Sequence, residues 1–171
     1  MLISGPCGVG KTAVAKILTR RTGIFYIDFD ELGVIDMKKR NPSISPFSTS
    51  FLNLKECLPP IINKVSDKFI LDIGGDSVFR HNVNNDDRLE QILWLKKTYS
   101  THIVILTAIK NILIQRFIST KSRKIIEFDR VWTDWLTVVK PNWQRCADLI
   151  IDTSFLTAND TSYLIEEIQE N

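Results

Sequence analysis

A chain of 171 residues is long enough for one domain with a full core and too short for two ordinary ones, so residues 1–171 are expected to form a single domain. The 22 basic and 20 acidic side chains give a net charge of only +2, which argues against nucleic acid or a membrane surface as the main partner. Three widely spaced cysteines, no room for a signal peptide before the first strand and no apolar run of membrane-spanning length indicate a reducing cytoplasm.

Residues 5–12 read Gly-Pro-Cys-Gly-Val-Gly-Lys-Thr, a glycine, four variable residues and then Gly-Lys-Thr. This spacing is typical of the phosphate-binding loop of P-loop proteins, in which glycines let successive backbone N–H groups face phosphate oxygens. An apolar strand at residues 1–4 and helical apolar spacing at 13–18 supply the context that the motif requires. We therefore expect a nucleoside triphosphate here, with Lys11 on the β- and γ-phosphates and the Thr12 hydroxyl on Mg²⁺. The candidate nucleotide contacts in this stretch are Gly5, Cys7, Gly8, Val9, Gly10, Lys11, Thr12 and Ala13.

Strands and helices alternate along the rest of the chain. The first helix is expected to end at Thr22-Gly23, and the pattern predicts further strands over residues 24–27, 69–73, 102–106 and 148–152. It predicts further helices over 47–64 with a break near Pro59-Pro60, over 86–99 and 111–118, over 127–147 with a bend at Pro141, and over 160–169 with an Asp at its start. This order favours an α/β fold in which helices cover both faces of a five-stranded parallel sheet.

Acidic residues follow two of the predicted strands, and ligands of parallel α/β sheets lie beyond the carboxyl ends of the strands. Strand alternation would point Asp28 and Asp30 the same way, and two such carboxylates are costly unless something positive lies nearby. The plainer interpretation is that they cap the next helix. Asp72, inside an apolar strand, favours a Mg²⁺ site, because a buried carboxylate without a partner is expensive.

The order of these motifs resembles that of the small-metabolite kinases of the P-loop class, most closely the shikimate kinase group, with nucleoside, nucleotide and gluconate kinases nearby. The likeness covers nearly the whole chain: the phosphate loop, an Asp-x-Asp, a glycine-rich turn at residues 74–75, a basic lid at 121–124 and Ala-Asp-Leu-Ile-Ile-Asp-Thr at 147–153. It implies a three-layer α/β/α P-loop NTPase fold with a helical lid, and ATP- and Mg²⁺-dependent phosphoryl transfer to a hydroxyl of a small-molecule acceptor.

The resemblance also implies roles for single residues. Asp28 would assist Mg²⁺, Asp72 would bind a magnesium water, and Asp30 would hold the acceptor hydroxyl and take its proton. Gly74 and Gly75 would approach the acceptor with their N–H groups, Asp76 stands in place of a third glycine, and Arg80 would lie near the acceptor. Arg123 would be the lid arginine and, together with Lys11 and Asp30, one of the catalytic residues. Arg116 and Thr153 would lie near the adenine. A solvated helix end is the alternative for Arg116 and Arg123, since charge runs usually are exposed. The tryptophans at 132, 135 and 143 have the spacing of core residues.

Departures from the shikimate kinase pattern concern the acceptor. Residues 51–55 read Phe-Leu-Asn-Leu-Lys where the family has Phe-Arg-x-x-Glu, and a second carboxylate-binding arginine appears as Lys140 or is lost. Leu cannot replace a bidentate Arg, so shikimate itself is not the expected acceptor, and Asp76 favours a hydroxyl-rich or cationic one. The alternatives are a nucleoside or nucleotide kinase, which could use Arg80, Arg88 and Arg130, and a nucleotide-binding regulatory protein or degenerate homologue without chemistry. Either a monomer or a homodimer is compatible with the sequence.

Overall fold

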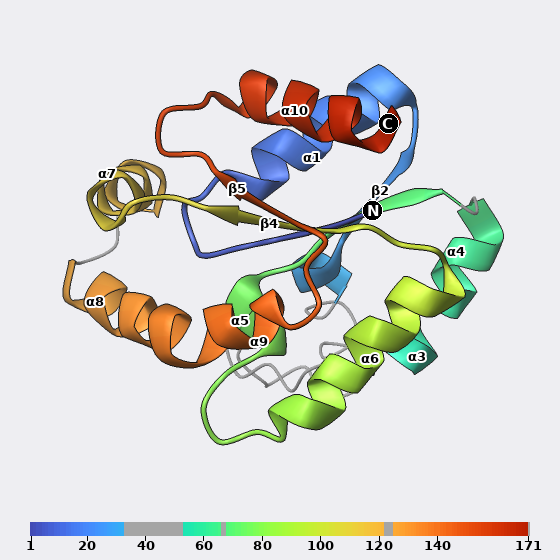
Figure 1. Cartoon of the computed structure of the whole chain (residues 1–171), viewed down its shortest axis with the longest axis horizontal. Coiled ribbons are helices and arrows are strands. Elements are labelled where there is room, and N and C mark those ends of the chain that lie inside the picture. The colour runs from blue at the N-terminus through green and yellow to red at the C-terminus, as the bar shows by residue number, and fades with distance from the viewer. Residues whose placement is uncertain (33–52, 66–67, 122–124, 171) are drawn as a thin grey trace.

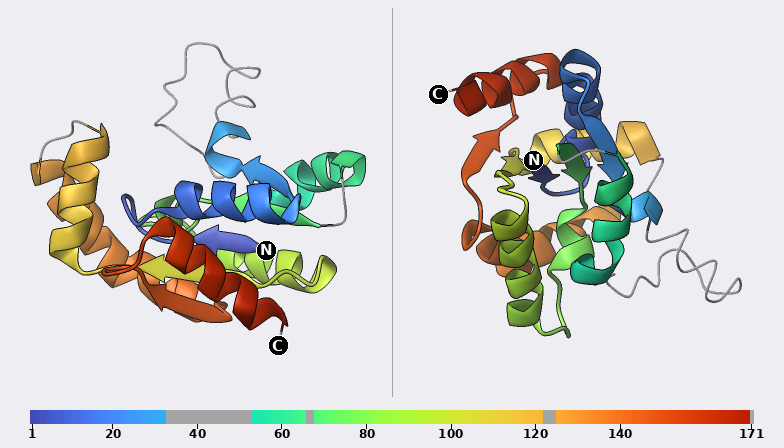
Figure 2. Two further views of the ribbon diagram at one scale, coloured as in Figure 1. Left: turned by 90° about the horizontal axis from the view of Figure 1, so that it is seen from above. Right: turned by 90° about the vertical axis from the view of Figure 1, so that its right-hand side faces the viewer.

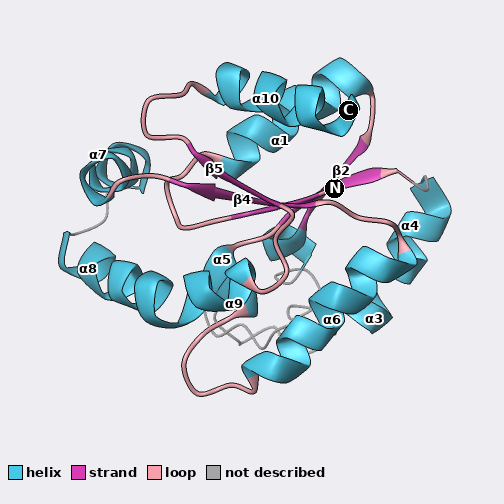
Figure 3. Cartoon of the chain, in the orientation of Figure 1, coloured by secondary structure: helices cyan, strands magenta, loops and turns pink. Residues whose placement is uncertain are grey.

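The computed structural model describes residues 1–32, 53–65, 68–121 and 125–170. Its centre is a sheet of five strands in the order β2-β3-β1-β4-β5 (Figures 1 and 3). The strands are β1 (Leu2–Ser4), β2 (Phe25–Asp28), β3 (Phe69–Asp72), β4 (Ile103–Thr107) and β5 (Leu149–Asp152). Every neighbouring pair is parallel, which confirms the predicted α/β sheet.

Helices cover both faces of the sheet (Figure 1). One face carries α1 (Lys11–Thr22) and α10 (Ala158–Glu170), which pack against each other. The opposite face carries α3 (Leu54–Cys57), α4 (Pro59–Val65), α5 (Gly75–Val78), α6 (Asn85–Thr98), the π-helical turn η1 (Trp135–Val139) and α9 (Lys140–Gln144). Helices α7 (Lys110–Lys121) and α8 (Ile125–Asp134) stand beyond the carboxyl ends of the strands (Figure 2), where the sequence predicts a lid.

Two hydrophobic cores result, one on each face of the sheet. Alternate residues of β3 serve different cores: Phe69 and Leu71 pack with α3, α4 and α6, whereas Ile70 packs with α1 and α10. The first core also buries Trp135 and Trp143, at 4% and 0% exposure, which confirms that these aromatic side chains belong to the interior.

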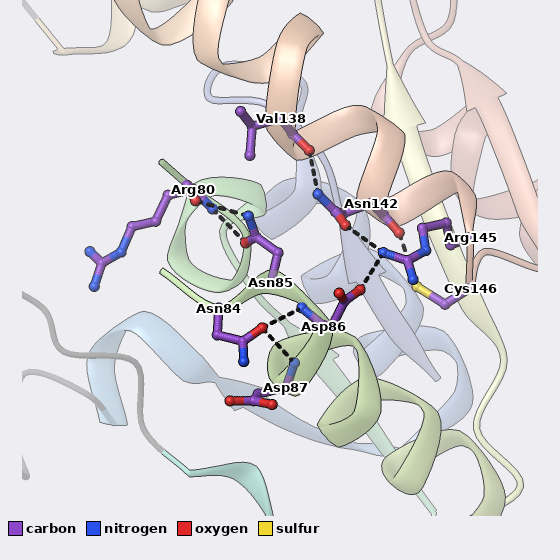
Figure 4. Close-up of polar contacts among 9 residues, drawn as sticks. All are labelled: Arg80, Asn84, Asn85, Asp86, Asp87, Val138, Asn142, Arg145 and Cys146. Atoms are coloured by element: carbon purple, nitrogen blue, oxygen red, sulfur yellow. Dashed lines mark hydrogen bonds and ion pairs between the residues drawn. The ribbon is translucent and has the colours of Figure 1, made fainter. Parts of the chain in front are cut away.

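Backbone signals in the sequence place most helix ends. Helix α1 ends at Gly23, whose φ of +69° is in the left-handed region that favours glycine. Helix α6 begins after Asn84, whose side chain accepts hydrogen bonds from the amides of Asp86 and Asp87 (Figure 4). Helix α10 begins earlier than predicted, because the Thr157 hydroxyl caps it by accepting from the Asp160 amide, while the Asp160 carboxylate accepts from the Thr157 amide.

Two long predicted helices are wrong in outline. A continuous helix from residue 47 is excluded because Asn53 is extended and caps α3, while residues 47–52 lie outside the described part. The predicted helix over 127–147 is divided by η1, so the irregularity lies at 135–139 and not at Pro141, which occupies the first turn of α9 where its missing N–H costs little. In the described residues, no helix has the length and apolar character needed to cross a membrane.

Candidate active site

The predicted phosphate loop, residues 5–12, joins the end of β1 to the start of α1. Gly8 and Gly10 have φ values of +81° and +102°, which few other residues adopt, and a Cβ at Gly5 would lie 2.3 Å from the carbonyl oxygen of Leu106. The Lys11 ammonium donates hydrogen bonds to the carbonyls of Gly5 and Pro6, at 3.1 and 3.2 Å. The lysine therefore lies curled over its own loop, within reach of any anion that the loop would hold.

The loop is joined to β3 through Thr12. Its hydroxyl donates a 2.6 Å hydrogen bond to Oδ2 of Asp72, whose side chain is only 5% exposed. Burial raises the pKa of Asp72, although the hydrogen bond from Thr12 and the positive charge of Lys11 act in the opposite direction. The predicted buried carboxylate thus has hydroxyl and cationic partners, yet its charge remains costly.

Asp28 lies beside Asp72, because the two residues are register partners on neighbouring strands. Oδ1 of Asp28 accepts a 3.0 Å hydrogen bond from the Glu31 amide, so this carboxylate caps the helical turn at 29–32. The Tyr26 hydroxyl lies between the two carboxylates, 3.3 Å from Oδ2 of Asp28 and 3.2 Å from Oδ2 of Asp72.

Asp30 does not share the surroundings of Asp28, which corrects the alternation argument. Strand β2 ends at Asp28 and residues 29–32 are helical, so Asp30 turns away from the carboxylate pair. Its Oδ1 instead accepts a 2.7 Å hydrogen bond from the hydroxyl of Ser77 on α5. A Cβ on Gly74 would lie 2.5 Å from Ser77 Oγ and 3.1 Å from Asp30 Oδ2, so the glycine leaves room for this contact.

Gly75 is bound on both sides within the protein. Its amide donates to the carbonyl of Gly5 at 3.3 Å, and its carbonyl accepts from the indole Nε1 of Trp143 at 3.3 Å. A Cβ there would lie 2.8 Å from the Trp135 ring. The expectation that the Gly75 N–H faces the acceptor is therefore wrong for this conformation, in which that N–H links α5 to the phosphate loop.

A divalent cation would find only oxygen donors between Thr12, Asp28 and Asp72. No group of three or more His, Cys, Asp or Glu side chains within the described ranges could hold a metal by itself. Mg²⁺ commonly binds through one or two carboxylates together with substrate phosphates and waters, so hydroxyl and carboxylate oxygens beside a phosphate loop fit that ion.

A cavity of ≈200 Å³ opens on the other side of the loop, between α1, α7 and α10. Arg116 borders it and donates to Oγ1 and the carbonyl oxygen of Thr153, at 3.2 and 2.9 Å. The Thr153 hydroxyl in turn lies 3.3 Å from the carbonyl oxygen of Val9. The structure thus brings together four predicted nucleotide contacts, Val9, Gly10, Arg116 and Thr153, and it adds Val14, Leu156, Thr157, Ala158 and Thr161 to the lining.

The other predicted site residues are more scattered. Ala13 and Asp76 are exposed, and Cys7 is a half-buried free thiol. The backbone of Arg80 is fixed in both directions by Asn85, while its guanidinium extends away from these contacts (Figure 4). Arg123 lies outside the described residues.

Sequence reasoning missed Tyr26 and Ser77. Tyr26 is two residues before Asp28 on the same strand, so alternation alone could have placed both side chains on one face. Nothing in the local pattern singles out Ser77, since its contact depends on the packing of α5 against the turn that follows β2.

No protein-family model matches the sequence, and no curated protein matches it. Solved structures are similar in fold. A shikimate kinase from Bacteroides thetaiotaomicron has a TM-score of 0.67 at 14% identity, covering 99% of this chain and 97% of that one. The tunicamycin resistance protein of Deinococcus radiodurans has a TM-score of 0.68 at 18% identity, covering 99% and 94%. A gluconokinase from Sinorhizobium meliloti 1021 has a TM-score of 0.53 at 15% identity, again covering 99% and 94%. The chain therefore has a shikimate kinase-like P-loop kinase fold.

Proposed function

We propose that this chain is an ATP-dependent kinase that transfers the γ-phosphoryl group to a hydroxyl of a small-molecule acceptor. The observation that carries the proposal is the meeting of three segments at the carboxyl ends of the strands: the phosphate loop, the Asp28 and Asp72 pair, and Asp30 with Ser77. Lys11, Thr12 and Asp72 are already joined by hydrogen bonding and charge, as a site for a metal–nucleotide complex requires.

Each group has a role in the proposed reaction. Lys11 would neutralise charge on the transferring phosphoryl group, and Arg123 would do so from the lid. Thr12, with Asp28 and Asp72, would hold Mg²⁺, which when bound supplies electrostatic stabilisation of the β- and γ-oxygens. Asp30, exposed and oriented by Ser77, would accept the proton of the acceptor hydroxyl. Arg116 and Thr153 would border the adenine.

The acceptor would be rich in hydroxyl groups or cationic, and not shikimate. Asp76 is exposed at the start of α5, close in sequence to Ser77, so it adds negative charge where the acceptor would bind. The similarity to a tunicamycin resistance protein makes tunicamycin one reasonable member of an acceptor panel. All three cysteines are free thiols, which supports a reducing cytoplasm as the place of the reaction.

A nucleotide kinase is the second candidate, because two arginines lie close together near the end of β3. Burial, and then the positive charge of Arg80, lower the pKa of Arg88 to about 10, which shows that the two guanidinium groups are close enough to interact. Two neighbouring guanidinium groups suit a phosphate. This observation favours a phosphorylated acceptor, and nucleoside monophosphates therefore belong in the same panel.

The test is ADP release, followed by a coupled assay, across sugars, polyols, aminoglycosides, nucleosides, nucleoside monophosphates, tunicamycin and shikimate. One acceptor should stimulate turnover, and Asp30→Asn should lower that stimulated rate by about 10²-fold or more while ADP still binds. ATP binding without stimulation by any acceptor would favour the nucleotide-binding regulatory protein or degenerate kinase homologue instead.

A further inference from the structure

Tyr26 contacts both carboxylates of the proposed metal site. Its hydroxyl lies 3.2 Å from Oδ2 of Asp72 and 3.3 Å from Oδ2 of Asp28, so one proton is shared between two acceptors. The contact follows from strand geometry, because Tyr26 and Asp28 project from the same face of β2 and Asp72 is the register partner of Asp28 on β3.

The two carboxylates repel each other. Neighbouring strands lie only about 4.8 Å apart, so register partners on one face are close together. The charge of Asp28 accordingly contributes to the raised pKa of Asp72. The Thr12 hydroxyl and the charge of Lys11 stabilise the Asp72 carboxylate against this repulsion, but their described hydrogen bonds go to Asp72, Gly5 and Pro6 and not to Asp28. Among the described residues, the Tyr26 hydroxyl is the one donor that reaches both carboxylates.

The phenol is suited to such a contact. Its ring packs against the core formed by α1 and α10, which fixes the position of the hydroxyl. A phenol hydroxyl carries its proton at neutral pH, so it can donate to either carboxylate oxygen within reach.

We propose that Tyr26 is a positioning residue whose hydroxyl holds Asp28 and Asp72 at the separation that a hydrated divalent cation needs beside the Thr12 hydroxyl. This role rests on the metal–nucleotide site of the proposed function. It adds a group that neither the phosphate loop nor the Asp-x-Asp motif contains. Partners that orient metal-binding groups commonly change metal affinity by about 10- to 100-fold when they are removed.

The test compares Tyr26→Phe with the wild type, using Mn²⁺ and ADP as probes. Tyr26→Phe keeps the ring in the core and removes only the hydroxyl. Electron paramagnetic resonance of free Mn²⁺ should show Mn²⁺ binding to the ADP complex weakened about tenfold. ADP affinity in EDTA should stay unchanged, which also shows that the variant is folded.

Tyr163→Phe is the matched control: Tyr163 is on α10, its ring lies under the guanidinium of Arg21 on α1, and the variant removes the same hydroxyl away from the site. It should bind Mn²⁺ like the wild type. In an Asp28→Asn background, Tyr26→Phe should weaken Mn²⁺ binding to the ADP complex by less than about threefold, because only one charged carboxylate remains for the hydroxyl to position.

Mn²⁺ affinity of Tyr26→Phe within about twofold of the wild type would overturn the role of Tyr26 and leave the proposed function standing. The same tenfold loss in the Asp28→Asn background would overturn it too. A wild type that binds neither ADP nor Mn²⁺ with ADP would instead overturn the nucleotide site, and this role with it.

Discussion

Gly74 is a glycine for reasons of space and not of backbone conformation. Its φ and ψ of −60° and 135° suit any residue, but Asp30 and Ser77 occupy the volume where a side chain would begin. The residue thus serves the contact between the end of β2 and α5, and with it the orientation of the proposed proton acceptor.

Gly74→Ala should lower the free energy of unfolding by about 1–3 kcal/mol, because the new methyl group would force Ser77 and Asp30 apart. Urea titration measures the loss. Ser77→Ala in the same chain removes the atom 2.5 Å from the added Cβ and should recover part of it. Strictly additive effects would show that the two residues do not share this space.

Asp72 illustrates a conflict between stability and the proposed metal-binding role at a single residue. Its carboxylate is almost fully buried, and the net effect of its surroundings is a raised pKa, so the charged form is a cost to the metal-free fold.

Asp72→Asn should therefore raise the melting temperature of the metal-free protein at pH 7 by about 2–4 °C, equivalent to about 1 kcal/mol. Thr12 and Tyr26 can still donate to the amide oxygen. The same variant should lose Mg²⁺-dependent turnover. A lower melting temperature, measured by calorimetry with Asp76→Asn as an exposed control, would contradict this account of Asp72.

At the scale of elements, Arg116 connects three segments of the proposed nucleotide site. It extends from α7 to Thr153, after β5, and Thr153 reaches the carbonyl of Val9 in the phosphate loop. The guanidinium thus borders the ≈200 Å³ cavity and also holds the residues that shape it.

Arg116→Ala should weaken ADP binding about tenfold, or about 1.4 kcal/mol, because it removes a wall of the cavity and frees Thr153. Calorimetric titration with ADP measures this. Arg20→Ala, on the exposed side of α1, is the control and should bind normally. Equal ADP affinities of the two variants would show that this cavity is not part of the nucleotide-binding site.

The order and type of the elements could be predicted because glycine, asparagine and apolar periodicity are local signals. Gly23 and the apolar runs of the strands place their elements within a residue or two. The turn at η1 could not be predicted, since one π-turn of five residues inside a helix shifts the apolar spacing too briefly to be recognised in the sequence. Asp30 was misplaced because Asp28-Phe29-Asp30 fits a continuing strand as well as a helix start, and only packing against α5 decides.

At the scale of the whole molecule, Asp148 joins segments that are distant in sequence. It accepts a 2.5 Å hydrogen bond from Lys96, at the end of α6, and a 2.9 Å bond from the Ile103 amide at the start of β4. Partial burial raises the pKa of Asp148, but these hydrogen bonds and the charge of Lys96 outweigh it and hold the pKa below its ordinary value of 3.8.

A carboxyl group whose pKa is lowered by folding stabilises the folded state at pH values above its ordinary, unfolded-state pKa. This stabilisation is lost as the pH falls through the pKa of the folded state. Asp148→Asn should therefore cost about 1 kcal/mol of unfolding free energy at pH 7, in a partly exposed pair. The difference from the wild type should nearly vanish near pH 3. Urea titrations at both values measure this, and a cost independent of pH would assign the effect to packing instead.

The central claim is phosphoryl transfer to an organic hydroxyl, and ³¹P nuclear magnetic resonance of ATP, Mg²⁺ and the stimulating acceptor tests it most directly. The account predicts a phosphomonoester signal that grows with ADP and is absent in Lys11→Ala. Inorganic phosphate alone, or a phosphomonoester formed equally well by Lys11→Ala, would contradict it.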